Sequence, residues 1–378
     1  MTSELLPTFE DLSPEQDAIY RLPLDRPSIV TGPPGSGKTV LALYRSQRLR
    51  GADMDHRVIT HSKVLRMYIE AAAKELEVDA FVSTFHSFIH WWWTTRDGVT
   101  GKPPQLKPYE FDWESILDTL GEVPDAGDLS HLIVDEAQDL PNKFFLVWRW
   151  IASAYTVFAD ENQRMTEQNS TIEQIMSRLG IDADAMHSLT TNYRNTAQIH
   201  DLAVAIDPEL GSEAPGRPER SGSLPRMVRF DDEDSEADHI ARLAAVPSNR
   251  TVGVFVPPDK RVSRRILRQL SSRLKGKGRS VQAYMSGVQG HSSLDWSLPG
   301  VYILMYPSTK GLQFDHVCIP RLETADRSSV DEDVTRMSFY VMATRARSGL
   351  TVSWNGPKGG SPPSVSSLFD RRLMEVEE

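Results

Sequence analysis

A glycine-rich stretch, SIVTGPPGSGKTV at residues 28–40, contains the pattern G-x-x-x-x-G-K-T between Gly32 and Thr39. An apolar run precedes the pattern and a helical pattern follows it, which is the context that a phosphate-binding loop requires. Glycines let backbone N–H groups surround phosphate oxygens, and the N-terminus of the following helix favours negative charge. We expect the Lys38 amino group to reach the β and γ phosphates and the Thr39 hydroxyl to bind Mg²⁺. The loop residues expected to line the phosphates are Gly35, Ser36 and Gly37.

A second stretch, HLIVDEAQDLP at residues 131–141, is an apolar run that ends in carboxylates. Asp135 stands where a further Mg²⁺ contact, usually made through water, is expected. Glu136 follows it and is suited to orient or deprotonate an attacking water molecule. Together with the phosphate loop, these carboxylates predict magnesium-dependent hydrolysis of a nucleoside triphosphate.

Both stretches need elements that bring them together, and the rest of the chain alternates strand and helix patterns. Helical patterns such as TVLALYRSQRLR and RRILRQLSSRL lie between short apolar runs. Strands that alternate with helices predict parallel sheets covered on both faces, an α/β fold. The runs expected to be strands are SIVTG, HRVIT, HLIVDE, YTVFAD, TVGVFVP, VYILMYP, HVCIP and LTVSW.

The same pattern divides the chain into two α/β units. We place the boundary in the region 184–190, which predicts one domain at residues 1–186 and a second at 187–378, with a nucleotide in the cleft between them. Residues 207–225 are rich in Pro, Gly, Ser and charge and are expected to form a surface loop. The tail from residue 356 has a composition typical of a flexible segment.

The composition limits the classes of function. The chain has 378 residues, a net charge of −10 and a single cysteine, Cys318. One cysteine excludes an internal disulfide, a cysteine-based zinc site and an iron–sulfur cluster. The N-terminus is acidic without an apolar core, and no run is long enough to span a membrane, so we expect a cytoplasmic protein. The negative charge argues against a protein that coats nucleic acid, but it leaves room for a local basic groove.

With DEAQD included, the sequence resembles the superfamily 1 helicases of the UvrD/Rep-like branch. The resemblance runs through nearly the whole chain, and the motifs come in the same order. Such a resemblance implies two RecA-like domains that hold ATP and Mg²⁺ between them. The segments that carry it, besides the phosphate loop and DEAQD, are LSPEQ (12–16), VITHSKV (58–64), STFHSF (83–88), FADENQ (158–163), TNYRN (191–195), STKGLQFD (308–315) and YVMATRAR (340–347).

The resemblance also implies roles for single residues. Gln16 corresponds to the glutamine that reads adenine, and Gln163 to the glutamine that senses the γ-phosphate. Tyr193 corresponds to a tyrosine that stacks on adenine, and Arg194 to an arginine that touches the γ-phosphate. Arg345 corresponds to the arginine finger of the second domain, a type of residue that raises phosphoryl-transfer rates by ~10³–10⁵.

The segment STKGLQFD, which resembles motif V of the family, contributes Gly311 and Gln313 to the expected nucleotide site. Gln313 stands where the family has glutamate, and it can still hydrogen-bond a ribose. Other positions of the family that grip a nucleic-acid strand are changed. Thr166 replaces a base-stacking aromatic residue, and Met305 and Pro307 replace the family's T-x-H; Val40 follows the loop threonine where many members have arginine.

The large accessory domains of the family, called 1B and 2B, have no counterpart of similar length here. Only 42 residues separate Phe88 from His131, where the first insertion would lie. We therefore expect a minimal two-domain motor. Base stacking is worth ~1–3 kcal/mol per base in single-strand binders, so loss of the aromatic residue at 166 weakens the expected grip.

Two features are open to alternative interpretations. The three tryptophans Trp91, Trp92 and Trp93 in FIHWWWTTRDG are either a stacking or docking platform or part of the core, whereas Trp148 and Trp150 are expected in the core. The stretch 260–279 has nine Lys or Arg in 20 residues and is either a phosphate-contacting face or a solvated helix face. The acidic run 231–238 is expected to begin a helix.

Two functions are compatible with these observations. The first is an ATPase that depends on nucleic acid and moves along a single strand, with DNA favoured over RNA and a partner protein supplying a wedge, nuclease or targeting function. The second is an ATP-gated interaction module or regulatory ATPase with little or no strand translocation. Nucleic-acid affinity that falls with salt would distinguish the first from the second.

Overall fold

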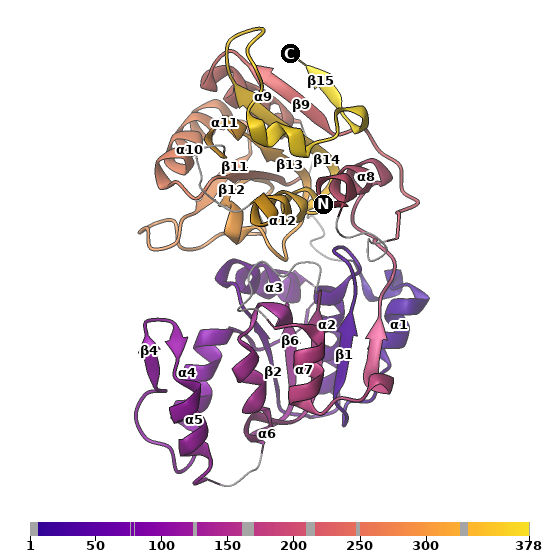
Figure 1. Cartoon of the computed structure of the whole chain (residues 1–378), viewed down its shortest axis with the longest axis vertical. Coiled ribbons are helices and arrows are strands. Elements are labelled where there is room, and N and C mark those ends of the chain that lie inside the picture. The colour runs from indigo at the N-terminus through magenta and orange to yellow at the C-terminus, as the bar shows by residue number, and fades with distance from the viewer. Residues whose placement is uncertain are drawn as a thin grey trace. The chain divides into compact units, whose positions relative to one another are not determined.

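The computed structural model describes residues 7–75, 77–78, 80–123, 127–160, 170–208, 216–246, 250–325 and 332–377. The chain divides into two compact units (Figure 1). Among the described residues, the N-terminal unit ends at Thr190 and the C-terminal unit begins at Thr191. Each unit is described by itself below.

The N-terminal unit contains a sheet of six parallel strands in its described residues, in the order β3-β2-β6-β7-β1-β8. The strand of the phosphate loop, β1, and the strand of the acidic motif, β6, are therefore separated only by β7. Because all the strands are parallel, their carboxyl ends meet at one edge of the sheet. The strands are β1 Ser28–Thr31, β2 His56–Thr60, β3 Val82–Thr84, β6 Leu129–Asp135, β7 Ala152–Ala159 and β8 Met186–Ser188.

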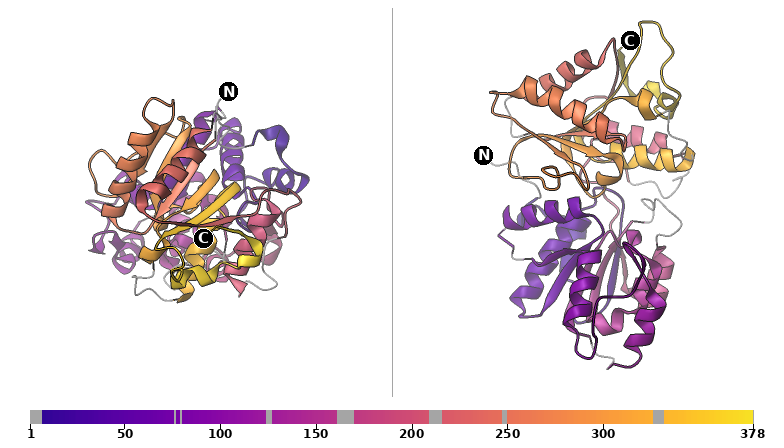
Figure 2. Two further views of the ribbon diagram at one scale, coloured as in Figure 1. Left: turned by 90° about the horizontal axis from the view of Figure 1, so that it is seen from above. Right: turned by 90° about the vertical axis from the view of Figure 1, so that its left-hand side faces the viewer.

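Helices cover both faces of this sheet (Figures 1 and 2). Alternate strand residues such as Ile29, Ile59 and Val157 join one buried apolar cluster with α4, α5 and α7. The residues between them, such as Val30 and Val58, point to the opposite face, as the period of a strand requires. The helices are α1 Pro14–Tyr20, α2 Lys38–Gly51, α3 Lys63–Glu75, α4 Phe85–Thr95, α5 Trp113–Leu120, α6 Trp148–Ile151 and α7 Ile172–Leu179.

The three tryptophans lie on α4, and the structure supports their role in the core. Trp92 and Trp93 are 1% and 2% exposed. Trp92 also donates a hydrogen bond from Nε1 to Asp128 Oδ2 over 2.9 Å. Trp91 is partly buried against the same cluster, with the Arg57 guanidinium 4.4 Å from its ring centroid. An exposed tryptophan platform is therefore not present on this helix.

The C-terminal unit contains a sheet of seven parallel strands in its described residues, in the order β11-β12-β10-β13-β14-β9-β15. The last strand, β15, pairs with β9, so the end of the described chain returns to an edge of this sheet. The strands are β9 Arg226–Phe230, β10 Val252–Val256, β11 Ser280–Tyr284, β12 Gly300–Met305, β13 Phe314–Ile319, β14 Ala346–Asn355 and β15 Glu375–Glu377.

Helices also cover both faces of the second sheet (Figure 1). Apolar residues of α9 and α10 pack on Val252, Val254 and Val256 of the central strand β10. The helices are α8 Ala197–Ile206, α9 Glu233–Ala245, α10 Lys260–Leu274, α11 Leu322–Ala325 and α12 Glu332–Ala343. Two parallel sheets flanked by helices confirm the predicted α/β fold class.

The basic stretch 260–279 forms α10 and the turn after it, and the acidic run 231–238 begins the neighbouring helix α9. Arg265 pairs with Glu233. Arg273 pairs with Asp234 over 2.9 Å and with Asp238 over 2.5 Å. The two charged segments thus neutralise each other in part, which a reading of either segment alone does not show.

Two further features complete the fold. A short antiparallel hairpin, β4 Gln105–Lys107 and β5 Glu110–Phe111, follows α4 and precedes α5. Among the helices that the structure describes, none is long and apolar enough to cross a membrane.

Candidate functional site

The glycine-rich loop lies between β1 and α2, and its glycines are required by the backbone. Gly35 and Gly37 have φ values of 83° and 94°, which disfavour side chains. A Cβ on Gly37 would lie 2.3 Å from Gln16 Nε2, and one on Gly32 would lie 2.9 Å from Leu189. Gly37 is also the N-cap of α2, so the loop leads into the positive end of a helix dipole.

The Lys38 ammonium group is buried and turned into this loop. Its Nζ donates to the carbonyl oxygens of Gly32, over 2.5 Å, and Pro33, over 3.0 Å. It also lies 3.4 Å from Asp160 Oδ2, at the carboxyl end of β7. The Lys38 cation is therefore held between the phosphate loop and the carboxyl end of β7.

Thr39 and Asp135 come together at the same edge, although 95 residues lie between them in the sequence. Thr39 Oγ1 donates to Asp135 Oδ2 over 2.8 Å. Asp135 is fully buried, and its pKa is raised, first by burial and then by the neighbouring charge of Glu136. A divalent cation would favour the ionised form of this carboxylate.

Mg²⁺ fits the pair formed by Thr39 and Asp135, because hydroxyl and carboxylate oxygens are the ligands it prefers. Among the described residues, no group of three or more His, Cys, Asp or Glu side chains could hold a metal ion. A magnesium ion at this pair would therefore need phosphate and water oxygens to complete its octahedral shell.

Glu136 follows β6 in a strained backbone conformation. Its φ and ψ are 55° and 47°, in the left-handed region, which costs on the order of 1–3 kcal/mol for a residue other than glycine. The side chain is buried, and its Oε2 accepts a hydrogen bond of 2.6 Å from Gln138 Nε2. Strain of this kind is retained mainly where the surroundings fix a functional side chain.

Gln16, expected to read adenine, contributes both ends of its amide to the fold. Nε2 donates to Ser36 O of the phosphate loop over 2.9 Å. Oε1 accepts from the backbone N–H of Ser13 over 3.0 Å, which completes the capping box of α1. Gln16 therefore supports the phosphate loop from the outside in this structure.

Arg45 of α2 holds the helix that carries Gln16. The side chain is fully buried and donates to the carbonyl oxygens of Ile19, Leu22 and Pro23, each over 3.1 Å. Burial lowers the pKa of Arg45 to about 10, so the group stays charged at neutral pH. The guanidinium group has five N–H donors in a fixed geometry, so it can hydrogen-bond several carbonyl oxygens at the end of α1 at once.

Gln163, the last residue of FADENQ, and Thr166, three residues further on, both fall outside the described residues. The structure does describe Asp160 and Ser170, on either side of them. The backbone N–H of Asp160 donates to Gln138 Oε1 over 3.0 Å, and the N–H of Ser170 donates to Gln138 O over 3.1 Å. Gln138 lies within DEAQD, but the sequence analysis gave it no role and did not predict these contacts.

The C-terminal unit brings together Arg194, Gln313 and the segment before β14. Arg194 Nε donates to Gln313 Oε1 over 3.3 Å, and its Nη1 donates to Thr344 O over 3.4 Å. Arg345 Nε donates to Val341 O over 2.9 Å, and its Nη2 to Thr344 Oγ1 over 3.1 Å. Both guanidinium groups thus lie at the carboxyl end of α12, where carbonyl oxygens favour positive charge.

Two further residues of the expected nucleotide site lie next to these side chains in the sequence, namely Tyr193 beside Arg194 and Gly311 close to Gln313. Gly311 has a φ of 77° just before Gln313. Tyr193 precedes Arg194, and its side chain is 46% exposed. An exposed ring is available for stacking, as the resemblance implies for this tyrosine.

Two asparagines of TNYRN, which the sequence did not single out, organise the arginines. Asn195 is buried, and its Nδ2 donates to Thr344 O over 3.2 Å and Ala346 O over 2.5 Å. These are the carbonyls on either side of Arg345. Asn192 Oδ1 accepts from the backbone N–H of Arg194 over 3.0 Å. Both asparagines lie inside a segment that the sequence analysis quoted, and this position was the only hint of their importance. Asn195 could not be given its role from sequence, because its partners Thr344 and Ala346 lie far along the chain.

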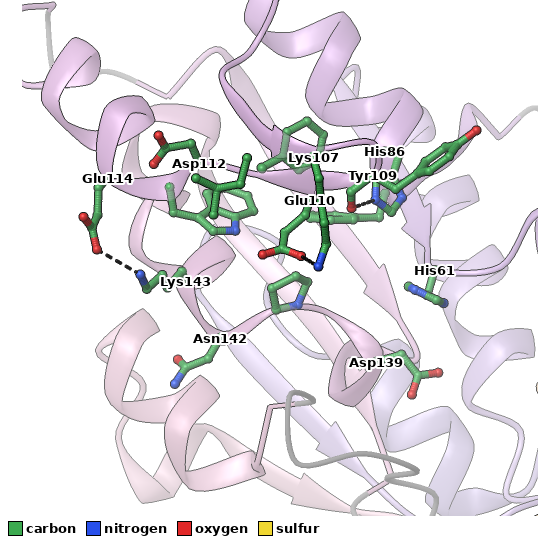
Figure 3. Close-up of a pocket in the computed structure, with 15 residues that line it drawn as sticks. His61, His86, Lys107, Tyr109, Glu110, Asp112, Glu114, Asp139, Asn142 and Lys143 are labelled. Atoms are coloured by element: carbon green, nitrogen blue, oxygen red, sulfur yellow. Dashed lines mark hydrogen bonds and ion pairs between the residues drawn. The ribbon is translucent and has the colours of Figure 1, made fainter.

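A cavity of about 810 Å³ lies beside the β4–β5 hairpin in the N-terminal unit (Figure 3). Tyr109 stands at the tip of the hairpin, is 80% exposed and has a φ of 68°. His86, from the quoted segment STFHSF, donates from Nε2 to Tyr109 O over 2.9 Å. The lining includes His61, Leu106, Phe111, Trp113, Asp139 and Asn142. The sequence gave no indication of this cavity.

Neither a protein-family model nor a curated protein sequence matches the chain. Solved structures do match. The C-terminal domain of a possible DNA helicase from Lactobacillus plantarum WCFS1 is 21% identical, covers 50% of this chain and 100% of its own, and has a TM-score of 0.36. The nonstructural protein 10 helicase of an arterivirus is 15% identical, with a TM-score of 0.40.

The arterivirus comparison covers 94% of this chain and 64% of the viral protein, so the chain spans less than two thirds of that relative. Both TM-scores are low. Function is therefore inferred from the residues and geometry of the site.

Proposed function

We propose that this chain is a magnesium-dependent ATPase of the superfamily 1, UvrD/Rep-like type, whose hydrolysis is coupled to single-stranded nucleic acid. DNA is favoured over RNA, and a partner protein supplies a wedge, nuclease or targeting function. The proposal includes two RecA-like domains, at residues 1–186 and 187–378, with the nucleotide between them.

One observation carries the ATPase part of the proposal. The hydroxyl of Thr39 and the carboxylate of Asp135 meet at 2.8 Å beside the phosphate loop. Two motifs that the sequence assigned to Mg²⁺ thus supply adjacent oxygen atoms at the carboxyl edge of one sheet. Ligands in open α/β sheets bind at this edge.

Each side chain has a task in this mechanism. Bound Mg²⁺ neutralises phosphate charge next to Thr39 and Asp135. Lys38 exchanges its carbonyl partners for β- and γ-phosphate oxygens, with which a charged donor makes stronger hydrogen bonds. Glu136 accepts a hydrogen bond or proton from the attacking water, and Gln163 senses the γ-phosphate.

The arginines stabilise charge on the transferring phosphoryl group. Arg194 and Arg345 belong to one hydrogen-bonded segment around Thr344, so they would approach the γ-phosphate together. Their guanidinium groups are worth most in the transition state, where the phosphoryl oxygens carry spread charge. Tyr193 stacks on the adenine. Gln16 reads the base by exchanging its present partners, Ser36 O and the Ser13 N–H, for groups of the adenine. Gly311 and Gln313 complete the nucleotide site.

An ATP-gated interaction module is the second candidate, and the cavity beside the hairpin favours it. Four carboxylates, from Glu110, Asp112, Glu114 and Asp139, line this cavity against two lysines. Lys107 pairs with Glu110 over 2.8 Å, and Lys143 pairs with Glu114 over 3.2 Å. Such a lining, beside the exposed Tyr109, suits a basic protein segment better than a phosphate backbone.

Steady-state ATP hydrolysis, measured with and without single-stranded DNA and RNA, tests the proposed function. The motor predicts strong stimulation by one nucleic acid and an affinity that falls with salt. Replacement of Tyr109 by serine should then leave oligonucleotide affinity unchanged if the hairpin serves a protein partner. Hydrolysis that ignores every oligonucleotide would reject the motor for this chain and favour the interaction module.

A further inference from the structure

Gln138, in the short 3-10 helix Ala137–Asp139 after β6, is fully buried, and its side-chain amide and main-chain carbonyl are all hydrogen-bonded. Its side-chain Nε2 donates to Glu136 Oε2 over 2.6 Å. Its side-chain Oε1 accepts from the N–H of Asp160 over 3.0 Å, and its main-chain oxygen accepts from the N–H of Ser170 over 3.1 Å. A single residue therefore connects Glu136 to both Asp160 and Ser170.

The same connection reaches the phosphate loop. Asp160 Oδ2 lies 3.4 Å from Lys38 Nζ, and both side chains are nearly inaccessible to solvent. A chain of contacts thus runs from Lys38 through Asp160 and Gln138 to the Glu136 carboxylate. In a dry environment these polar contacts are strong and leave their members few alternative positions.

We propose that Gln138 is a positioning residue that sets the orientation of the Glu136 carboxylate and links it to Asp160 at the end of β7. This inference rests on the proposed function, in which Glu136 acts on the attacking water. Gln138 itself touches neither substrate nor metal. Its amide binds Oε2 of Glu136, whose backbone is already strained. With one carboxylate oxygen held, the orientation of the whole carboxylate, and so the position of Oε1, is set by this hydrogen bond.

A purely structural role is the competing explanation, because a buried glutamine also satisfies the backbone N–H groups of Asp160 and Ser170. The two explanations differ in what Glu136 loses. Gln138→Met keeps the side-chain length and removes both amide functions. Ser170→Ala is the matched control, since it removes the 2.7 Å hydrogen bond from Ser170 Oγ to Leu140 O at the same junction without touching Glu136.

The first measurement is ATP turnover by the full chain, with the KM for ATP, for wild type and both variants. Gln138→Met should lower kcat by ~10²-fold, the effect of a small misplacement of a reacting group. The KM for ATP should stay within about threefold, because ground-state binding is not changed. Ser170→Ala should lower the thermal midpoint but leave kcat within about threefold. Equal losses of kcat in both variants, or a Gln138→Met enzyme as active as wild type, would overturn the inference.

A second measurement does not depend on hydrolysis. Hydrogen–deuterium exchange followed by mass spectrometry reports the Asp160 amide in peptides that end β7. Gln138→Met should accelerate exchange there, and unchanged exchange would show that the link to Asp160 is not formed. Failure of wild type to hydrolyse ATP would reject the proposed function, whereas an active Gln138→Met enzyme would reject this inference alone.

Discussion

The two sheets present their candidate residues at opposite edges. In the N-terminal unit the phosphate loop follows β1, Glu136 follows β6 and Asp160 follows β7. In the C-terminal unit Gln313 precedes β13 and Arg345 precedes β14. One unit therefore uses the carboxyl edge of a parallel sheet, and the other uses the amino edge.

The difference follows from the helix ends found at each edge. A strand that ends at the carboxyl edge leads into the N-terminus of a helix, as β1 leads into α2 through Gly37. That end offers N–H donors to anions. At the amino edge the helix α12 ends, and its carbonyl oxygens hold the guanidinium groups of Arg194 and Arg345. The fold thus supplies phosphate-binding groups in one unit and oriented cations in the other.

Removal of the cation at the carboxyl edge should have the largest effect. Lys38→Ala should lower ATP turnover at least ~10³-fold, because a charged, water-excluded donor to the phosphates is lost. Steady-state kinetics checks this. Lys74→Ala, which changes an exposed lysine in the last turn of α3, should leave turnover unchanged. Turnover by Lys38→Ala near the wild-type rate would mean that the loop does not bind the phosphates.

A smaller effect is expected at the amino edge from Asn195→Ala. The change leaves two buried carbonyls, of Thr344 and Ala346, without this donor and should cost about 1–3 kcal/mol of stability. Arg345 lies between these carbonyls, so kcat should also fall roughly tenfold. Chemical denaturation and ATP turnover check the two parts separately.

Gln198→Ala is the control for Asn195→Ala. Gln198 lies in the first turn of α8, and its Oε1 accepts a hydrogen bond of 2.8 Å from the backbone N–H of the exposed Gly222. It should change neither stability nor kcat appreciably. Loss of stability in Asn195→Ala without loss of kcat would show that the asparagine supports the fold but not the orientation of Arg345.

The smallest effect is expected away from both edges, on the charged pair of helices α9 and α10. Arg273→Ala removes ion pairs with the exposed carboxylates of Asp234 and Asp238 and should cost ~0.2–1 kcal/mol. ATP turnover and oligonucleotide affinity should not change. A marked loss of oligonucleotide affinity would instead restore the basic stretch 260–279 as a nucleic-acid contact.

Much of the fold could be predicted from the sequence because its strongest signals are local. The apolar runs expected to be strands, such as HLIVDE and TVGVFVP, form β6 and β10. In the two parallel sheets, strands β3, β8, β9, β11 and β15 were not predicted, because each has three to five residues and only some of these are apolar. Their positions depend on the neighbouring strand with which they pair.

The candidate site was predictable where a residue type is fixed by its own chemistry. Lys38, Thr39 and Asp135 stand in motifs whose backbone and charge requirements are narrow. In the structure Thr39 donates to Asp135, and burial raises the pKa of the Asp135 carboxylate while the charge of Lys38 lowers it. Gln138 and Asn195 lie within recognised motifs, but their partners are more than 20 and 140 residues away in the sequence. Such contacts depend on which strands are neighbours, which periodicity does not reveal.

The tryptophans and the basic stretch are residues whose exposure could not be predicted from the sequence. Three aromatic residues in a row look available until α5 and the hairpin are found packed against α4. Nine basic residues look like a nucleic-acid face until α9 is found beside them. In both cases a neighbour remote in sequence decides whether a side chain is exposed.

The central claim is that the carboxyl edge binds ATP and the amino edge accelerates its hydrolysis. The most direct test measures binding of a fluorescent ATP analogue and ATP turnover in the same preparations of wild type, Lys38→Ala and Arg345→Ala. Arg336→Ala is the control on α12, where the partly exposed side chain pairs with Glu332. The account predicts that Lys38→Ala loses both properties, whereas Arg345→Ala keeps the affinity and loses ~10³-fold in turnover. Arg345→Ala that turns over ATP at the wild-type rate, or wild type that binds no nucleotide, would contradict it.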